Sequence, residues 1–161
     1  MSEALTARVL FVCLGNICRS PTAHGVFQAL VDERGMAGRI SVDSCGTGSW
    51  HVGEPPDRRA ASAASRRGYD LTSLRARQVA LEDFDQFDFI LAMDQQNLVD
   101  LQRLQPAHFA GHLGLFLDFA FEPPVREVPD PYYGGAGGFD EVLDLVESAS
   151  EGLLKAIADA D

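Results

Sequence analysis

The segment over residues 13–20 combines a cysteine, an arginine and two residues that tolerate a left-handed backbone. It has the sequence Cys-Leu-Gly-Asn-Ile-Cys-Arg-Ser, which places Cys13 and Arg19 at a Cys-x5-Arg spacing. A thiolate is a strong nucleophile, and a guanidinium fork matches two oxygens of a phosphate group. A thiol beside a cation at the start of a helix ionises readily. This spacing therefore predicts a thiolate nucleophile next to a bound oxyanion.

The flanking residues indicate why this loop would close around an anion. Residues 8–12 form a short apolar run typical of a buried parallel strand, and apolar residues recur at helical spacing after Pro21. Ser20 fits the N-cap position and Pro21 the first helical position. The free N–H groups at such a helix N-terminus bind anions. Gly15 and Asn16 suit a tightly wound cradle, because both adopt positive φ more easily than other residues.

A buried structural role is the alternative for Cys13, because free cysteines are commonly small core residues. The complete pattern of Cys, Gly, Asn, Arg and Ser between a strand and a helix favours chemistry instead. Two other phosphate-binding loops are excluded. The segment has neither the Gly-x-Gly-x-x-Gly of dinucleotide sites nor the Gly-Lys-Ser/Thr of nucleotide-binding loops.

The rest of the chain alternates predicted strands with predicted helices. We expect strands at residues 40–45, 88–93 and 112–117, and helices capped by Asp57 and Asp94 and a last one over 139–157. This alternation is typical of an α/β fold. We predict one domain over residues 1–161, a three-layer open parallel sheet of about four strands with helices on both faces. Ligands bind at the carboxyl ends of such strands, where residue 13 lies.

Composition restricts the classes of partner. The chain carries 13 Lys and Arg against 24 Asp and Glu, a formal net charge of −11. This charge repels nucleic acid and anionic membranes, so neither is an expected partner. No apolar run reaches the ~20 residues that span a bilayer, and the first residues lack a signal-peptide pattern. Three cysteines do not form a secreted disulfide framework, so a soluble cytoplasmic protein is expected.

Residues 12–21 resemble the phosphate-binding loop of the low-molecular-weight protein tyrosine phosphatases. The Asp-Pro-Tyr-Tyr segment over residues 130–133 resembles the general-acid loop of the same family. The resemblance extends over essentially the whole chain, including Trp50, the Ala-Arg-Gln of residues 76–78 and the predicted strand that ends at Asp94. It implies an α/β phosphatase that uses a cysteine and needs neither a metal nor a cofactor.

The resemblance also implies roles for individual residues. Cys13 would attack phosphorus to form a phosphocysteine, and Arg19 would bind the phosphoryl oxygens. Asp130 would protonate the leaving phenolate and then activate the water that hydrolyses the intermediate. Other residues would form the loop, support the thiolate or wall the slot for the aromatic ring; they are Leu14, Gly15, Asn16, Ile17, Cys18, Ser20, Trp50, Tyr132 and Tyr133.

Cys18 matches a family position whose thiol forms a reversible disulfide with the nucleophile, which implies a redox-sensitive site. Simple burial is the alternative for this residue. The expected partner is a phosphotyrosine-containing protein, with a tyrosine kinase as one candidate. The expected oligomeric state is a monomer or a weak dimer.

Three positions leave details of the prediction open. Asp130 precedes a proline, and Asp-Pro is also common in ordinary turns. Trp50 is either a core residue or, because its loop is rich in glycine, an exposed binding residue. Leu74 stands where many family members have a histidine that supports Asn16 and Ser20, and leucine forms no hydrogen bond. Either another group supports these two side chains or they are held differently.

The four histidines, at positions 24, 51, 108 and 112, lack the spacing of metal ligands with any cysteine, so no metal site is predicted. His24 occupies a polar position of its predicted helix and is expected to face solvent. His51 follows Trp50, and either lines the cleft or makes ordinary loop contacts.

Three other functions compete with tyrosine phosphatase activity. Arsenate reductases of this fold use additional cysteines near the middle of the chain, but no cysteine follows Cys45. Relatives that act on phosphoarginine have a threonine at the position of Ile17. A non-catalytic phosphate-binding or redox-sensing protein should lose Cys13 or Asp130 while it keeps Arg19. All three residues are present.

Overall fold

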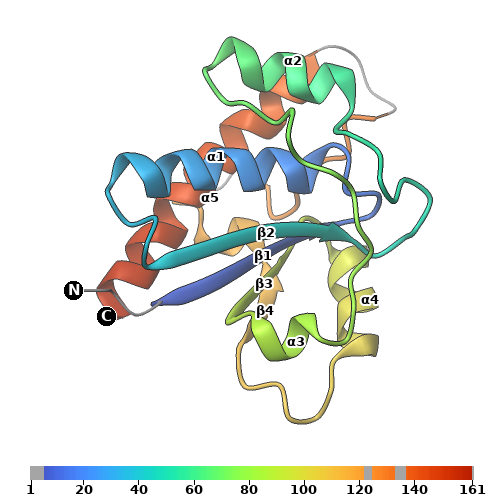
Figure 1. The fold of residues 1–161 in the computed structure, drawn as a ribbon, viewed down its shortest axis with the longest axis vertical. Coiled ribbons are helices and arrows are strands. Elements are labelled where there is room, and N and C mark those ends of the chain that lie inside the picture. The colour runs from blue at the N-terminus through green and yellow to red at the C-terminus, as the bar shows by residue number, and fades with distance from the viewer. Residues whose placement is uncertain (1–5, 122–124, 133–136, 161) are drawn as a thin grey trace.

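The computed structural model describes residues 6–121, 125–132 and 137–160. Its centre is a four-stranded parallel sheet with the strand order β2-β1-β3-β4 (Figure 1). The strands are β1 (Ala7–Cys13), β2 (Ile40–Gly46), β3 (Phe89–Ala92) and β4 (His112–Leu115). All four lie where the sequence predicted them. The last strand is shorter than expected, because Phe116–Phe119 forms a 3-10 turn, η1, instead of continuing the strand.

Helices cover both faces of this sheet, which confirms the predicted three-layer α/β architecture (Figure 1). On one side lie α1 (Arg19–Glu33), α2 (Arg58–Arg66) and α5 (Gly137–Ala160); on the other lie α3 (Asp83–Gln86) and α4 (Gln95–Leu104). The short helix α3 was not predicted from the sequence. Within the described part of the chain, no helix has both the length and the apolar character needed to cross a bilayer.

The continuous apolar run of β1 follows from burial on both faces. Consecutive side chains of a strand point to opposite sides of the sheet. Val9 and Phe11 belong to the apolar cluster beneath α1 and α5, whereas Leu10 and Val12 belong to the cluster on the α4 side. A strand that contributes to two cores needs apolar residues on both faces, which Val9 to Val12 supply, whereas Arg8 is exposed.

The strand order brings distant segments to the end of β1. This strand has β2 on one side and β3 on the other, so the connections that leave β1 and β3 diverge and open a crevice. The Met93 N–H donates to the Val12 carbonyl (3.1 Å), and the Val128 N–H donates to the Met93 carbonyl (2.8 Å). These two bonds place the segment that leads to Asp130 beside the end of β1.

Helix α1 begins earlier than the sequence predicted. Its N-cap is Cys18 and its first residue is Arg19, so the prediction of Ser20 as the N-cap was wrong. Pro21 then lies at the third helical position, where its missing N–H breaks no intrahelical bond, because the first four N–H groups of a helix have no such partner. The early start turns the Ser20 hydroxyl toward Cys13.

The caps predicted for α2 and α4 are confirmed. The Asp57 carboxylate accepts a hydrogen bond from the Arg59 N–H at the start of α2. The Asp94 carboxylate accepts one from the Asn97 N–H, and the Asn97 side-chain oxygen accepts one from the Asp94 N–H. This reciprocal capping box holds Asp94 in place. Asp94 comes two residues after the end of β3, directly after Met93.

The packing of Phe11 provides a test of the core. Its buried ring makes edge contacts with Phe27 and Phe116, at centroid separations of 5.7 and 4.8 Å. We expect Phe11→Ala to lower the free energy of unfolding by about 3–5 kcal/mol, because it leaves a cavity between both rings. Urea denaturation measures this loss. The control Phe121→Ala removes a ring that is 86% exposed and should change stability by less than about 0.5 kcal/mol. Similar losses for both variants would contradict this assignment of the core.

Candidate active site

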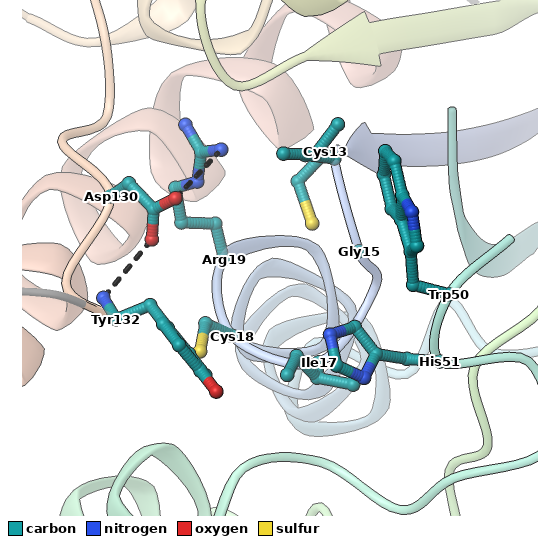
Figure 2. A pocket seen from close by; sticks show the side chains of 10 residues that line it. Cys13, Gly15, Ile17, Cys18, Arg19, Trp50, His51, Asp130 and Tyr132 are labelled. Carbon is teal, nitrogen blue, oxygen red and sulfur yellow. Dashed lines mark hydrogen bonds and ion pairs between the residues drawn. The ribbon is translucent and has the colours of Figure 1, made fainter. Parts of the chain in front are cut away.

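A pocket of about 340 Å³ lies at the carboxyl end of β1 (Figure 2). Three segments that are far apart in the sequence contribute its lining: Cys13, Leu14, Gly15, Ile17, Cys18 and Arg19; Trp50 and His51; Asp130 and Tyr132. Most of the residues singled out from the sequence therefore gather at one place. The predicted residue Tyr133 lies outside the described residues.

Hydrogen-bond donors surround the sulfur of Cys13. The Asn16 N–H donates to Sγ across 3.2 Å, and the Ser20 hydroxyl oxygen lies 3.0 Å from Sγ. An ionised sulfur only accepts hydrogen bonds, so the Ser20 hydroxyl donates to it in the thiolate form. The same hydroxyl lies 3.3 Å from the Cys45 carbonyl oxygen, which is the more distant of its two possible acceptors. The sulfur therefore has a backbone N–H and a hydroxyl group within hydrogen-bond distance.

Asn16 is held in the left-handed conformation that the sequence predicted for it, with φ of +58°. Its amide nitrogen donates to the Ser20 hydroxyl (2.8 Å), and its amide oxygen accepts from the Arg77 N–H (3.0 Å). A backbone N–H thus supports Asn16, although the side chain of Leu74 supplies no hydrogen bond. Leu74 packs against the apolar cluster instead.

Gly15 serves the loop in a different way from the one predicted. Its φ is not positive. A Cβ atom at this position would come within 2.9 Å of Cδ2 of His51. The residue is therefore restricted by the close approach of the His51 ring, which lines the pocket and pairs with Glu54 through Nδ1 (3.1 Å).

The guanidinium of Arg19 is buried, with only 3% of the residue exposed. Its Nη1 donates to Oδ2 of Asp94 (2.6 Å) and to the Val128 carbonyl (3.1 Å). Burial by itself would lower the pKa of Arg19, but the Cys13 sulfur and the Asp94 carboxylate outweigh it and raise that pKa. The ion pair holds a permanently charged guanidinium in the pocket that also contains the Cys13 sulfur. The guanidinium has further N–H donors on its other nitrogens.

Asp130 lines the pocket and also forms a local turn. Its Oδ1 accepts from the Tyr132 N–H (3.0 Å), which forms a local turn. Its Oδ2 lies 3.8 Å from Nη2 of Arg19. Figure 2 shows the carboxylate across the pocket from Trp50, with the Cys13 sulfur between them.

Trp50 and Tyr132 form opposite walls in the view of Figure 2. Trp50 is 70% exposed, so the alternative of a core tryptophan was wrong. The side chain of Ile17, which is almost completely buried, adds apolar surface near the His51 ring. These side chains give the pocket an apolar lining on the sides away from Arg19 and Asp130.

The three cysteines are free thiols and differ in their surroundings. Cys18 lines the pocket, where burial, followed by the Asp57 carboxylate and the Cys13 sulfur, raises its pKa to about 12. Cys45 is completely buried in the sheet, and burial raises its pKa well above the ordinary value. Among the described residues, no group of three or more His, Cys, Asp or Glu side chains could hold a metal ion.

The prediction that His24 faces solvent was wrong. Its ring is partly buried, with Nδ1 2.9 Å from the Ser44 hydroxyl. Burial lowers the pKa of His24, Arg77 acts in the same direction and Asp43 opposes them. Residues four apart in a helix lie on the same face. A predicted helix that already included Ser20 would therefore have placed His24 on the same face as Ser20, which is the face toward β2.

Sequence reasoning also assigned no role to the side chain of Arg77. Its guanidinium is held by Asp43 (3.1 Å) and by the buried Asp83 (3.0 Å). These ion pairs hold the segment around Arg77, and the backbone N–H of Arg77 donates to the Asn16 side chain. The sequence contained little sign of this cluster, because Asp43, Arg77 and Asp83 become neighbours only in the folded chain.

The lowered pKa of His24 leads to a test of stability against pH. Below about pH 6.5 an unfolded histidine binds a proton that the folded His24 resists, so stability falls as the pH falls. We expect His24→Gln to show a shallower decline in the free energy of unfolding between pH 7.5 and 5.5, measured by urea denaturation. Equal declines in the wild type and the variant would contradict the burial of a neutral imidazole.

Comparison with known proteins agrees with this geometry. A family model described as low molecular weight phosphotyrosine protein phosphatase matches residues 8–161. A low molecular weight protein-tyrosine-phosphatase of Bacillus subtilis is 42% identical over 149 residues, which are 92% of this chain and 94% of the relative.

Solved structures give the same result. A protein tyrosine phosphatase of Entamoeba histolytica matches with a TM-score of 0.92 and 38% identity, over 96% of this chain and 98% of that one. A Drosophila arginine phosphatase matches with a TM-score of 0.86 and 32% identity, over 92% and 96% of the two chains. Because sequence and structure agree over nearly the whole length, the chain belongs to the low-molecular-weight phosphotyrosine protein phosphatase family.

Proposed function

We propose that this protein hydrolyses phosphotyrosine in proteins through a phosphocysteine formed on Cys13. The observation that carries the proposal is the arrangement of one pocket, in which a hydrogen-bonded thiol, a buried guanidinium and an exposed carboxylate face the same space. A nucleophile, a charge stabiliser and a proton donor are the parts that transfer of a phosphoryl group to a thiol requires.

In the first step the Cys13 thiolate attacks phosphorus in line with the phenolic oxygen. The P–S bond forms as the P–O bond breaks, and Asp130 gives its proton to the departing phenolate. Arg19 and the N–H groups of the loop bind the three equatorial oxygens, where negative charge accumulates in the transition state. The Arg19–Asp94 ion pair holds the guanidinium in place before the substrate arrives, so little reorganisation accompanies the reaction.

In the second step Asp130, now ionised, accepts a proton from a water molecule that attacks the phosphocysteine. The new P–O bond forms as the P–S bond breaks, and inorganic phosphate leaves. The thiolate returns to its starting place, where the Ser20 hydroxyl and the Asn16 N–H stabilise its charge. The complete reaction consumes one water molecule and releases the phenol and inorganic phosphate, without electron transfer.

The walls of the pocket support an aromatic phosphate ester as substrate. Trp50 and Tyr132 offer flat apolar faces, while Leu14, Ile17 and Cys18 complete the lining. Phosphoarginine is the second candidate, because one structural neighbour is a Drosophila arginine phosphatase. The apolar side chain of Ile17 favours a phenyl ring over a guanidinium, which carries N–H donors that need acceptors.

The direct test is release of phosphate from a phosphotyrosine peptide in EDTA and fresh reductant. We expect turnover by the wild type and none by Cys13→Ser, since a serine hydroxyl does not ionise at neutral pH. Asp130→Asn should lower the rate by about 10²–10⁴, because the general acid is lost. Turnover by Cys13→Ser, or absence of turnover by folded wild type, would contradict the proposal. Turnover of a phosphoarginine peptide alone would establish the second candidate.

We further propose that Cys18 protects the nucleophile by forming a disulfide with it. Hydrogen peroxide would oxidise the Cys13 thiolate to a sulfenic acid, and the Cys18 thiol would then condense with it and release water. Both thiols line the same pocket, whereas Cys45 does not.

Recovery from peroxide tests this protection. After a brief peroxide treatment, dithiothreitol should restore the activity of the wild type and of Cys45→Ser, but restore less activity in Cys18→Ser. Without a resolving thiol the sulfenic acid proceeds to irreversible forms. Equal recovery in all three proteins would contradict a protective role for Cys18.

We also propose that residues 1–161 act as one domain in the cytoplasm, on phosphotyrosine-containing proteins of which a tyrosine kinase is one candidate. A monomer or weak dimer is proposed, with no nucleic-acid partner. The net charge of −11 and the three free thiols support this setting.

A further inference from the structure

Arg59 lies beside the pocket and contacts one of its walls. The Cζ atom of its guanidinium is 5.3 Å from the centre of the Tyr132 ring and 4.9 Å from the centre of the Phe139 ring. Tyr132 belongs to the segment that carries Asp130, whereas Phe139 lies near the start of α5. A guanidinium at these distances attracts the faces of both rings. Arg59 thus connects the wall of the pocket to a helix.

The Arg59 guanidinium is itself held in one orientation by Asp57. Its Nε and Nη2 donate to the two carboxylate oxygens across 3.1 and 3.0 Å. The Arg59 N–H also donates to Asp57, the N-cap of α2 (2.8 Å). A planar fork bound at two points has a fixed plane, so it can position a ring that stacks on it.

Asp57 in turn is joined to the loop of the nucleophile. Its N–H donates to the Ile17 carbonyl across 2.8 Å. At the other end of the chain of contacts, the Tyr132 N–H donates to Asp130. A continuous path therefore runs from the loop around Cys13, through Asp57 and Arg59, to the Asp130 carboxylate.

We propose that Arg59 is a positioning residue that holds the proton donor at its working distance from the nucleophile by stacking on Tyr132. The inference rests on the proposed function, in which Asp130 protonates the leaving group. Loss of the stack would remove one restraint on Tyr132 and shift the carboxylate that its N–H orients. Arg59 itself is not among the described residues that line the pocket.

Leaving groups of different basicity separate this role from a general structural one. Phenolate is a poor leaving group that needs a proton, whereas p-nitrophenolate leaves readily without one. We expect Arg59→Ala to lower kcat/KM for phenyl phosphate by about tenfold or more, because small displacements of a catalytic group are costly, and to lower that for p-nitrophenyl phosphate much less. The ratio kcat/KM reports formation of the phosphocysteine even where its hydrolysis limits kcat.

Arg67 supplies a matched control at the other end of α2. It also joins this helix to α5, through Asp140, Asp144 and Glu147. Arg67→Ala should leave the ratio of the two rates at the wild-type value. Arg59→Lys keeps the charge but loses the planar fork, so it should resemble Arg59→Ala in selectivity while it folds normally by circular dichroism.

A double variant tests whether Arg59 acts through Asp130. If it does, Arg59→Ala should add little to the loss already caused by Asp130→Asn. The amide ¹H and ¹⁵N resonances of residues 130 and 132 should also shift in Arg59→Ala and not in Arg67→Ala, a readout independent of activity.

Equal losses on both substrates, additive losses in the double variant, or unmoved amide resonances would overturn the inference. Failure of the wild type to hydrolyse either ester would instead overturn the proposed function, while the amide resonances would still report whether Arg59 holds the segment.

Discussion

The buried positive charge of Arg19 is the constraint on which the rest of the site depends. A guanidinium with 3% of its residue exposed is stable only with a partner, and removal of that partner leaves an uncompensated charge. The partner is the Asp94 carboxylate, just after the end of β3, and the Val128 carbonyl is a second acceptor for the Arg19 guanidinium.

This single charge therefore joins three separate parts of the chain. The loop after β1 supplies the arginine, the loop after β3 supplies the carboxylate, and the segment before Asp130 supplies the carbonyl. The bond from the Val128 N–H to the Met93 carbonyl keeps the last of these in register. Because parallel strands end at the same edge of a sheet, the strand order β2-β1-β3-β4 places the first two parts at that edge, and this bond brings the third part to them.

Local patterns were sufficient to predict the strands, the layers and the loop around Cys13, whereas Trp50, Asp130 and Tyr132 were assigned to the site from the family resemblance. The apolar run of β1, the caps Asp57 and Asp94, and the Cys-x5-Arg spacing all lie within short segments. The fate of Ser20 was different. A serine before a proline resembles an N-cap locally, but bonds to Cys13 and Asn16 determine its role, and those depend on where α1 begins. The roles of His24, Arg77 and Arg59 depend on contacts between distant segments, which no local pattern contains.

The exposed position of Trp50 has a practical consequence. It is the only tryptophan of the chain, and its indole stands largely in water at the wall of the pocket. Indole emission shifts to shorter wavelengths when water is excluded from the ring. The intrinsic fluorescence of the whole protein is thus a local reporter of what occupies the pocket, so occupancy can be followed in solution without a label and without catalysis.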